Sequence, residues 1–281
     1  MSKAPGKMSS LGTVRTFIKV GSCSETICNV LNRAFDHPQK LEERASMPLA
    51  GGLMQHGYQC GMIWGAALAA GAQAYQLHGP GPKAETAAVV AAQRLVESFR
   101  DLNTHINCLE ITDIDKSSSK LRMVTHFLLK GGVVRCFRMA ARYAPVAFSE
   151  INSGLAEEHL DTPAQPASCA AMMARRMGAS DMQAAMTAGF AGGIGLCGGA
   201  CGALGAVIWI IGMNSSKEQA GKVDYKAPGA VEAVDRFIEH TRGKFECAEI
   251  VGRRFKDVED HADYLRNGGC SDIFDMLAAG R

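Results

Sequence analysis

Aromatic residues are scarce in this chain, at 6% of 281 residues, and charged residues reach only 21%. The 47% share of hydrophobic residues is that of a globular protein, which excludes wholesale disorder. Alternating runs of β-branched residues, the usual signal of strands, are also few. Because Gly, Ala and Met are abundant instead, the composition predicts an all-α fold with small residues at the helix contacts.

An excess of either charge is absent as well, since 30 Lys and Arg face 28 Asp and Glu. No basic block is interleaved with aromatic residues, so we do not expect nucleic acid as a partner. The first twenty residues, "MSKAPGKMSSLGTVRTFIKV", lack the apolar run of a secretory signal. The expected location is therefore the cytoplasm.

Ten cysteines are present, and in a reducing cytoplasm such a number indicates metal binding or redox chemistry rather than disulfides. Neither the Cys-x-x-Cys step of common ferredoxins nor a Cys-x-x-Cys-His run occurs. Covalent c-type haem is therefore not expected.

An internal repeat orders these cysteines. "AGGLMQHGYQCGMIWGAALAAG" is answered without a gap by "AGGIGLCGGACGALGAVIWIIG", and shorter matches place the other cysteines in register. Each half then carries four cysteines in the same order. They are Cys23, Cys60, Cys108 and Cys136 in the first half and Cys169, Cys201, Cys247 and Cys270 in the second.

Four thiolates are the usual complement of a tetrahedral zinc ion or an iron–sulfur cluster, whereas packing cysteines have no reason to recur in fours. The repeat therefore predicts a metal-centred role for all eight cysteines. The halves span residues 13–151 and 167–281, and the proline-containing polar stretch 152–166 is the predicted linker.

Most segments between the loops have the periodicity of helices. Residues 83–102 carry an apolar stripe of Val89, Leu95, Val96 and Phe99, and residues 227–242 repeat it. Ser180 is the predicted N-cap of a further helix. The expected architecture is two similar helical domains in tandem.

Residues 184–213 contain no charged side chain and are long enough to span a bilayer, which takes about 20 apolar residues. The equivalent segment of the first half, however, carries Gln55, His56 and Gln59. Glycine also costs a helix about 1 kcal/mol per residue relative to alanine. We therefore expect no membrane insertion, and predict a glycine-rich turn followed by a buried helix.

The segments "GGIGLCGGACGALGA" and "GGLMQHGYQCGMIWGA", with flanking cysteines in the same order, resemble the redox-active protein family named for its pattern of C, GCAxxG, C and C. That family is related to the split-Soret cytochromes c. The resemblance covers most of the chain, twice, and implies redox activity through an iron–sulfur centre of unspecified type. The sequence departs from the family pattern at Met62, where the family has alanine, and at Gly205, which comes one residue early.

Two further residues are weaker candidates for ligands or tuning groups. Cys197 lies four residues before Cys201, and His56 lies four residues before Cys60. Packing and surface roles are at least as consistent with the pattern. His126 and His261 recur before the last cysteine of each half and are candidate neighbours of the centres, while Cys28 is expected in the core.

Three function hypotheses remain open at this point. The first is an iron–sulfur electron-transfer protein that serves a partner redox enzyme. The second is an oxidoreductase that uses a thiol pair or an open metal site, and the third is a zinc-stabilised interaction scaffold. The pattern does not decide whether the chain is an enzyme, which substrate it has, or whether it forms a homo-oligomer.

Overall fold

The computed structural model describes residues 9–126, 131–157, 162–163, 166–218 and 224–279. Within these ranges every regular element is helical, and the only strand-like pairs are two isolated bridges. The elements of the first repeat are α1 (Ser10–Val20), α2 (Cys23–Ala34), α3 (Lys40–Ala45), the 3₁₀ turn η1 (Met47–Leu49), α4 (Gly61–His78), α5 (Pro82–Asn103), α6 (Cys108–Thr112), α7 (Lys120–Val124) and α8 (Gly132–Leu155). Those of the second are α9 (Cys169–Arg176), α10 (Asp181–Ala188), α11 (Gly202–Glu218), α12 (Pro228–His240), α13 (Cys247–Val251), α14 (Val258–Arg266) and α15 (Ser271–Ala278).

The prediction of an all-α fold is confirmed, and so are the helices that the periodicity indicated. α5 and α12 occupy the two predicted segments, and the stripe of α5 is fully buried. Ser180 caps α10 through a complete capping box, in which its hydroxyl and the Gln183 side chain each accept a backbone N–H. The stripe of α12 begins at Val231, which is 37% exposed, so only its later residues reach the core.

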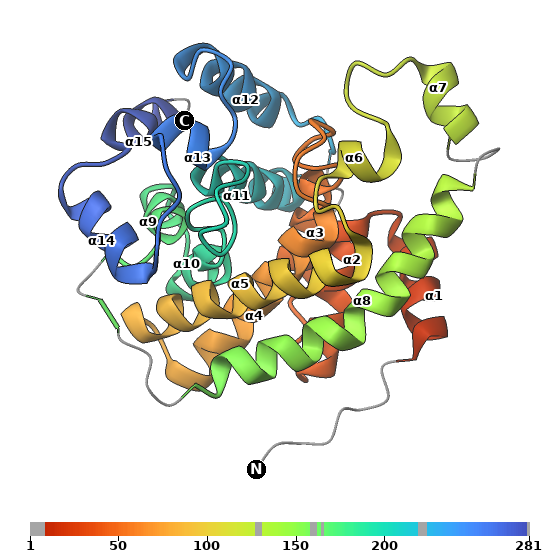
Figure 1. Cartoon of the computed structure of the whole chain (residues 1–281), viewed down its shortest axis with the longest axis horizontal. Helices are drawn as coiled ribbons and strands as arrows, with labels where there is room; N and C mark the ends of the chain where they lie inside the picture. The colour runs from red at the N-terminus through yellow and green to blue at the C-terminus, as the bar shows by residue number, and fades with distance from the viewer. Residues whose placement is uncertain (1–8, 127–130, 158–161, 164–165, 219–223, 280–281) are drawn as a thin grey trace.

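The two repeats pack on one another (Figure 1). Their buried side chains form one hydrophobic core. α4 lies against α2 and α5 of its own repeat and also against α10 of the second repeat. In the reciprocal arrangement α11 packs on α9 and α12 and also on α3 of the first repeat. Trp64 and Phe190 meet edge to face across this boundary, with ring centroids 4.7 Å apart.

Equivalent positions of the two repeats touch each other, which defines a local two-fold relation between them. The gapless alignment offsets these positions by 141 residues. Gln59 accepts a hydrogen bond from the backbone N–H of its equivalent Ala200 at 2.8 Å, and Gln183 donates to its equivalent Glu42 at 3.1 Å. A residue contacts its own counterpart only at such an axis.

The glycine-rich stretch near residue 195 is a turn that leads into buried α11, as predicted. No helix within the described residues is both long enough and apolar enough to cross a membrane. α8 extends to Leu155 and α9 begins at Cys169, so the first residues of the predicted linker belong to α8. The boundaries 13–151 and 167–281 stay predictions.

Candidate cysteine centres

A left-handed turn precedes the second cysteine of each repeat. Residues 51–55 and 192–196 all have positive φ, between 52° and 80°, although five of them are not glycines: Leu53, Met54, Gln55, Ile194 and Leu196. Such a conformation costs about 1–2 kcal/mol for each side chain that carries a Cβ. Glycine is required at Gly52 and Gly193, where a Cβ would lie 2.2 and 2.4 Å from backbone atoms. The sequence therefore maintains a strained loop at the same place in both repeats.

Each loop directs one backbone N–H group at the sulfur of the first cysteine, and the helix that this cysteine begins supplies a second. Gly51 and Ser24 donate hydrogen bonds to the sulfur of Cys23, and Gly192 and Ala170 donate to that of Cys169. Such donors favour the thiolate form of a cysteine because they stabilise its negative charge.

Seven of the eight predicted ligands lie at the start of a helix. Cys23, Cys108, Cys169 and Cys247 are the first residues of their helices, and Cys60, Cys201 and Cys270 immediately precede theirs. Cys136 lies inside α8. Because the positive end of the helix dipole stabilises anions, this placement suits thiolates.

Short backbone bridges hold the second and third cysteines of each repeat beside each other. In the first repeat the N–H of Cys60 donates to Ile106 and that of Cys108 donates to Tyr58, both at 2.7 Å. In the second repeat the same bonds join Cys201 to Phe245 at 3.0 Å and Cys247 to Gly199 at 2.6 Å. The duplicated sequence thus builds duplicated geometry.

The four cysteines of the second repeat line one small cavity of about 20 Å³, the space of roughly one water-sized sphere. Phe255, His261, Tyr264 and Phe274 complete its walls. Burial raises the pKa of Cys201 to about 12 and lowers that of His261 to about 4, so its imidazole is neutral at pH 7. A cluster of several atoms fits there only if the thiol side chains turn outward.

The first repeat encloses far more space. Cys23, Cys108 and Cys136 line a cavity of about 550 Å³, and buried Cys60 donates a hydrogen bond to Cys23. That bond lowers the pKa of Cys23 and raises the pKa of Cys60. Glycine at position 61 allows Cys23 to lie this close to Cys60, because a Cβ at position 61 would lie only 2.7 Å from the sulfur of Cys23.

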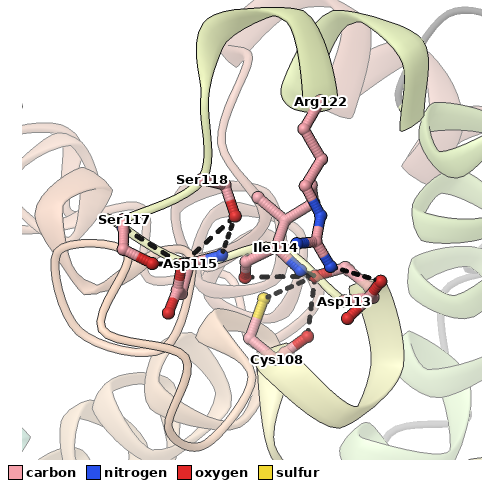
Figure 2. A network of polar contacts seen from close by, with 8 residues as sticks. Cys108, Asp113, Ile114, Asp115, Ser117, Ser118 and Arg122 are labelled. Atoms are coloured by element: carbon pink, nitrogen blue, oxygen red, sulfur yellow. Dashed lines mark hydrogen bonds and ion pairs between the residues drawn. The ribbon is translucent and has the colours of Figure 1, made fainter.

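The loop that follows Cys108 is fixed by side-chain hydrogen bonds (Figure 2). Thr112 donates to the carbonyl oxygen of Cys108 at 2.8 Å. Asp115 accepts bonds from Ser117 and Ser118, and Arg122 forms an ion pair with Asp113 at 2.5 Å. Cys108 therefore sits on a short helix whose far end is anchored.

The weaker candidates lie away from the two cavities, apart from His261. Cys197 donates from its thiol to the carbonyl oxygen of Gly193 at 2.8 Å, and His56 stacks on Phe245 with ring centroids 5.0 Å apart. Burial lowers the pKa of His56 to about 4. Cys28 is fully buried beside Asn32, as expected of a core residue. The His126 ring lies next to Gly132, where it would meet a Cβ.

The fit of a single metal ion to these cysteines is poor. Within the described ranges, no three His, Cys, Asp or Glu side chains converge closely enough to hold one ion. Zinc takes its sulfur ligands at about 2.3 Å. An iron–sulfur cluster spreads its cysteine ligands over several iron atoms, so its sulfurs lie farther apart. The first cavity has the space for such a group.

The sequence pattern did not predict the positions of Tyr225, Tyr264 and Gln59 near the cysteine centres. Tyr225 of the second repeat lines the first cavity and donates to the carbonyl oxygen of Ala50 at 2.8 Å. The hydroxyl of Tyr264 lies 3.7 Å from the sulfur of Cys270. The spacing of cysteines within one repeat cannot identify a residue that the other repeat contributes. The only signal in the sequence is the gapless alignment, which makes residues 59 and 200 equivalent, and these two residues meet at the local two-fold axis.

Gln59 bridges the two glycine-rich loops and is fully buried. Besides its bond with Ala200, it donates to the carbonyl oxygen of Gly193 at 3.0 Å and to the sulfur of Cys197 at 3.6 Å. A Gln59→Leu substitution leaves the Ala200 N–H without a partner in the interior. Each such group costs about 1–3 kcal/mol.

We therefore expect Gln59→Leu to lower the free energy of unfolding by about 1–3 kcal/mol, as measured by urea denaturation. Gln76→Leu is the control, because Gln76 is exposed at the end of α4 and should change stability by less than about 0.5 kcal/mol. Equal stability of both variants would contradict the bridging role.

Comparison with known proteins gives one result. The family model described as "Putative redox-active protein (C_GCAxxG_C_C)" matches residues 22–147 and again residues 166–279. No curated protein and no solved structure matches the chain. The two matched segments contain the two sets of cysteines whose surroundings are described above, and together they cover most of the sequence. The chain therefore belongs to the C_GCAxxG_C_C family of redox-active proteins, as a tandem duplication of its cysteine motif.

Proposed function

We propose that the protein is an electron-transfer protein that binds iron–sulfur clusters through its two sets of four cysteines. The observation that carries this proposal is that both repeats surround their cysteines in the same way. Each has the left-handed loop, the backbone N–H donors to its first cysteine and the backbone bridge between its second and third cysteines. Each predicted unit, 13–151 and 167–281, would supply one set of ligands.

The chemistry of the donors supports a cluster. Thiolates are soft ligands that suit iron–sulfur clusters, and backbone N–H bonds to sulfur tune their reduction potentials. Without a metal, burial holds the pKa of Cys108 and Cys136 at about 12. A cluster would bind these cysteines as thiolates and so release their protons. The proposed location is the cytoplasm, where such thiols stay reduced.

The partner would be an acidic redox protein. Arg135, Arg138 and Arg142 lie along α8 at a surface hollow next to the first centre, and none of them has an ion pair among the described residues. An acidic surface would complement this arginine face, and such complementarity raises association rates.

Anaerobic purification tests the proposal. The protein should be brown, with visible absorption that dithionite bleaches, and elemental analysis should find iron and acid-labile sulfide in equal amounts. A colourless protein that contains zinc and no iron would instead support the scaffold hypothesis. A colourless protein without any metal would leave the dithiol chemistry described next.

A second candidate function rests on the hydrogen bond between Cys60 and Cys23. The Cys23 thiolate would attack one sulfur of a disulfide substrate, which forms a mixed disulfide and releases one thiolate. The Cys60 thiol, after losing its proton, would then attack Cys23 and release the other. The products are a Cys23–Cys60 disulfide and a reduced dithiol substrate. Thiol counting before and after oxidation of the metal-free protein should then show the reversible loss of two thiols.

A further inference from the structure

The two cysteine centres differ in the space beside them, although their cysteines come from equivalent elements. The first cavity measures about 550 Å³ and the second about 20 Å³. In the second repeat, side chains of α14 and α15 such as Leu265 and Phe274 fill the volume. In the first repeat, α1 packs on α8, with the rings of Phe17 and Phe137 4.8 Å apart, and these two residues and Ile18 line the larger cavity without filling it.

A volume of 550 Å³ is in the range of small-molecule sites, which run from about 300 to 1,000 Å³. It is also larger than the cavity that the equivalent cysteines line in the second repeat. The cavity is partly open to solvent, and Ile18, one of the residues that line it, is 66% exposed. An external molecule can therefore reach the thiols of this centre, and the second centre offers no such space.

The walls determine what kind of molecule fits. No Asp, Glu, Lys, Arg or His is among the described residues that line the cavity. Met47, Ile114, Val133 and the two phenylalanines supply an apolar surface, and the hydroxyl of Tyr225 is already engaged with Ala50. A charged ligand would lose its hydration here without gaining an ionic partner, which costs several kcal/mol.

We propose that the first cavity binds an uncharged, mainly apolar small molecule along the wall formed by Phe17, Ile18, Val133 and Phe137, beside the cysteines that would hold the cluster, and that this molecule is the substrate of the redox centre. The role as substrate rests on the proposed function, whereas the binding itself follows from the cavity alone. The second centre then exchanges electrons without contacting a substrate. The two repeats thus have different tasks.

Fluorescence titration with the neutral probe N-phenyl-1-naphthylamine tests this site. The wild-type protein should bind the probe saturably. Val133→Trp fills the cavity and should weaken binding at least tenfold. Val134→Trp is the matched control, because Val134 is the next residue of α8, is 58% exposed and lines the arginine-bordered hollow instead. It should bind the probe as the wild type does.

Ile18→Arg provides a variant that should not disturb folding, because position 18 is exposed at the rim. It should also weaken probe binding, and circular dichroism confirms that each variant is folded. Absence of probe binding to the wild type, or equal binding by the Val133 and Val134 variants, overturns the site. Iron and sulfide are measured on the same samples. Probe binding without iron would refute the proposed function alone, and iron without probe binding would refute this inference alone.

Discussion

Gly65→Ala should lower the free energy of unfolding by about 3 kcal/mol or more, the largest loss of stability that we expect from any of these substitutions. A Cβ at position 65 would lie 2.1 Å from the carbonyl oxygen of Ser24 and 3.2 Å from the backbone nitrogen of Cys28. Both atoms belong to the backbone of α2, so no side chain can rotate away and the two helices must separate. Overpacking of this kind costs about 1–3 kcal/mol or more, and here the Cys23–Cys60 contact moves as well.

Gly229→Ala is the matched control, since Gly229 also lies in a helix but a Cβ there meets its first neighbour, Ile211, at 3.7 Å. Alanine should leave stability unchanged or raise it by about 0.5–1 kcal/mol, because glycine loses more entropy on folding. Thermal unfolding followed by circular dichroism distinguishes the two. A Gly65→Ala protein as stable as the control would show that α2 and α4 are not held this closely.

Cys60→Ser should remove the first cluster and Cys201→Ser the second, so that each variant retains about half of the iron and sulfide of the wild type. Serine preserves the volume of the side chain but not the soft thiolate ligand. Each residue precedes the long central helix of its repeat. Cys201 lines the second cavity, whereas Cys60 contacts Cys23 of the first centre. The loss should therefore be confined to one centre.

Cys28→Ala controls for the loss of a buried thiol, because Cys28 is equally buried but lies outside the repeated pattern. Its iron content per folded chain should equal that of the wild type. Full iron in Cys60→Ser and Cys201→Ser would end the assignment of ligands. A parallel loss in Cys28→Ala would mean that iron content reports stability rather than coordination.

Much of this arrangement could be predicted because duplication makes spacing informative. The alignment of the two halves locates the glycine-rich turns and makes Cys60 and Cys201 equivalent. In the structure both residues form the same backbone bridge. The helices α5, α10 and α12 were accessible because their apolar periodicity and caps are local properties.

Other features depend on packing between the repeats and have no local signal. The early glycine of the second motif is an example: Gly205 faces Trp64, and a Cβ there would lie 2.3 Å from the indole ring. The position equivalent to Gly65 is instead Ala206. The role of Tyr225 and the unequal cavities likewise depend on which elements of one repeat reach the other.

The contact between Trp64 and Gly205 also shows what a single chain makes possible. In a dimer of identical single-repeat chains, residues on the symmetry axis meet copies of themselves. Two tryptophans would collide there, and two glycines would leave a hole. Joining both copies in one chain lets a large residue pair with a small one, as Gln59 also pairs with Ala200. Covalent linkage thereby frees each half to diverge, so one can remain open while the other closes.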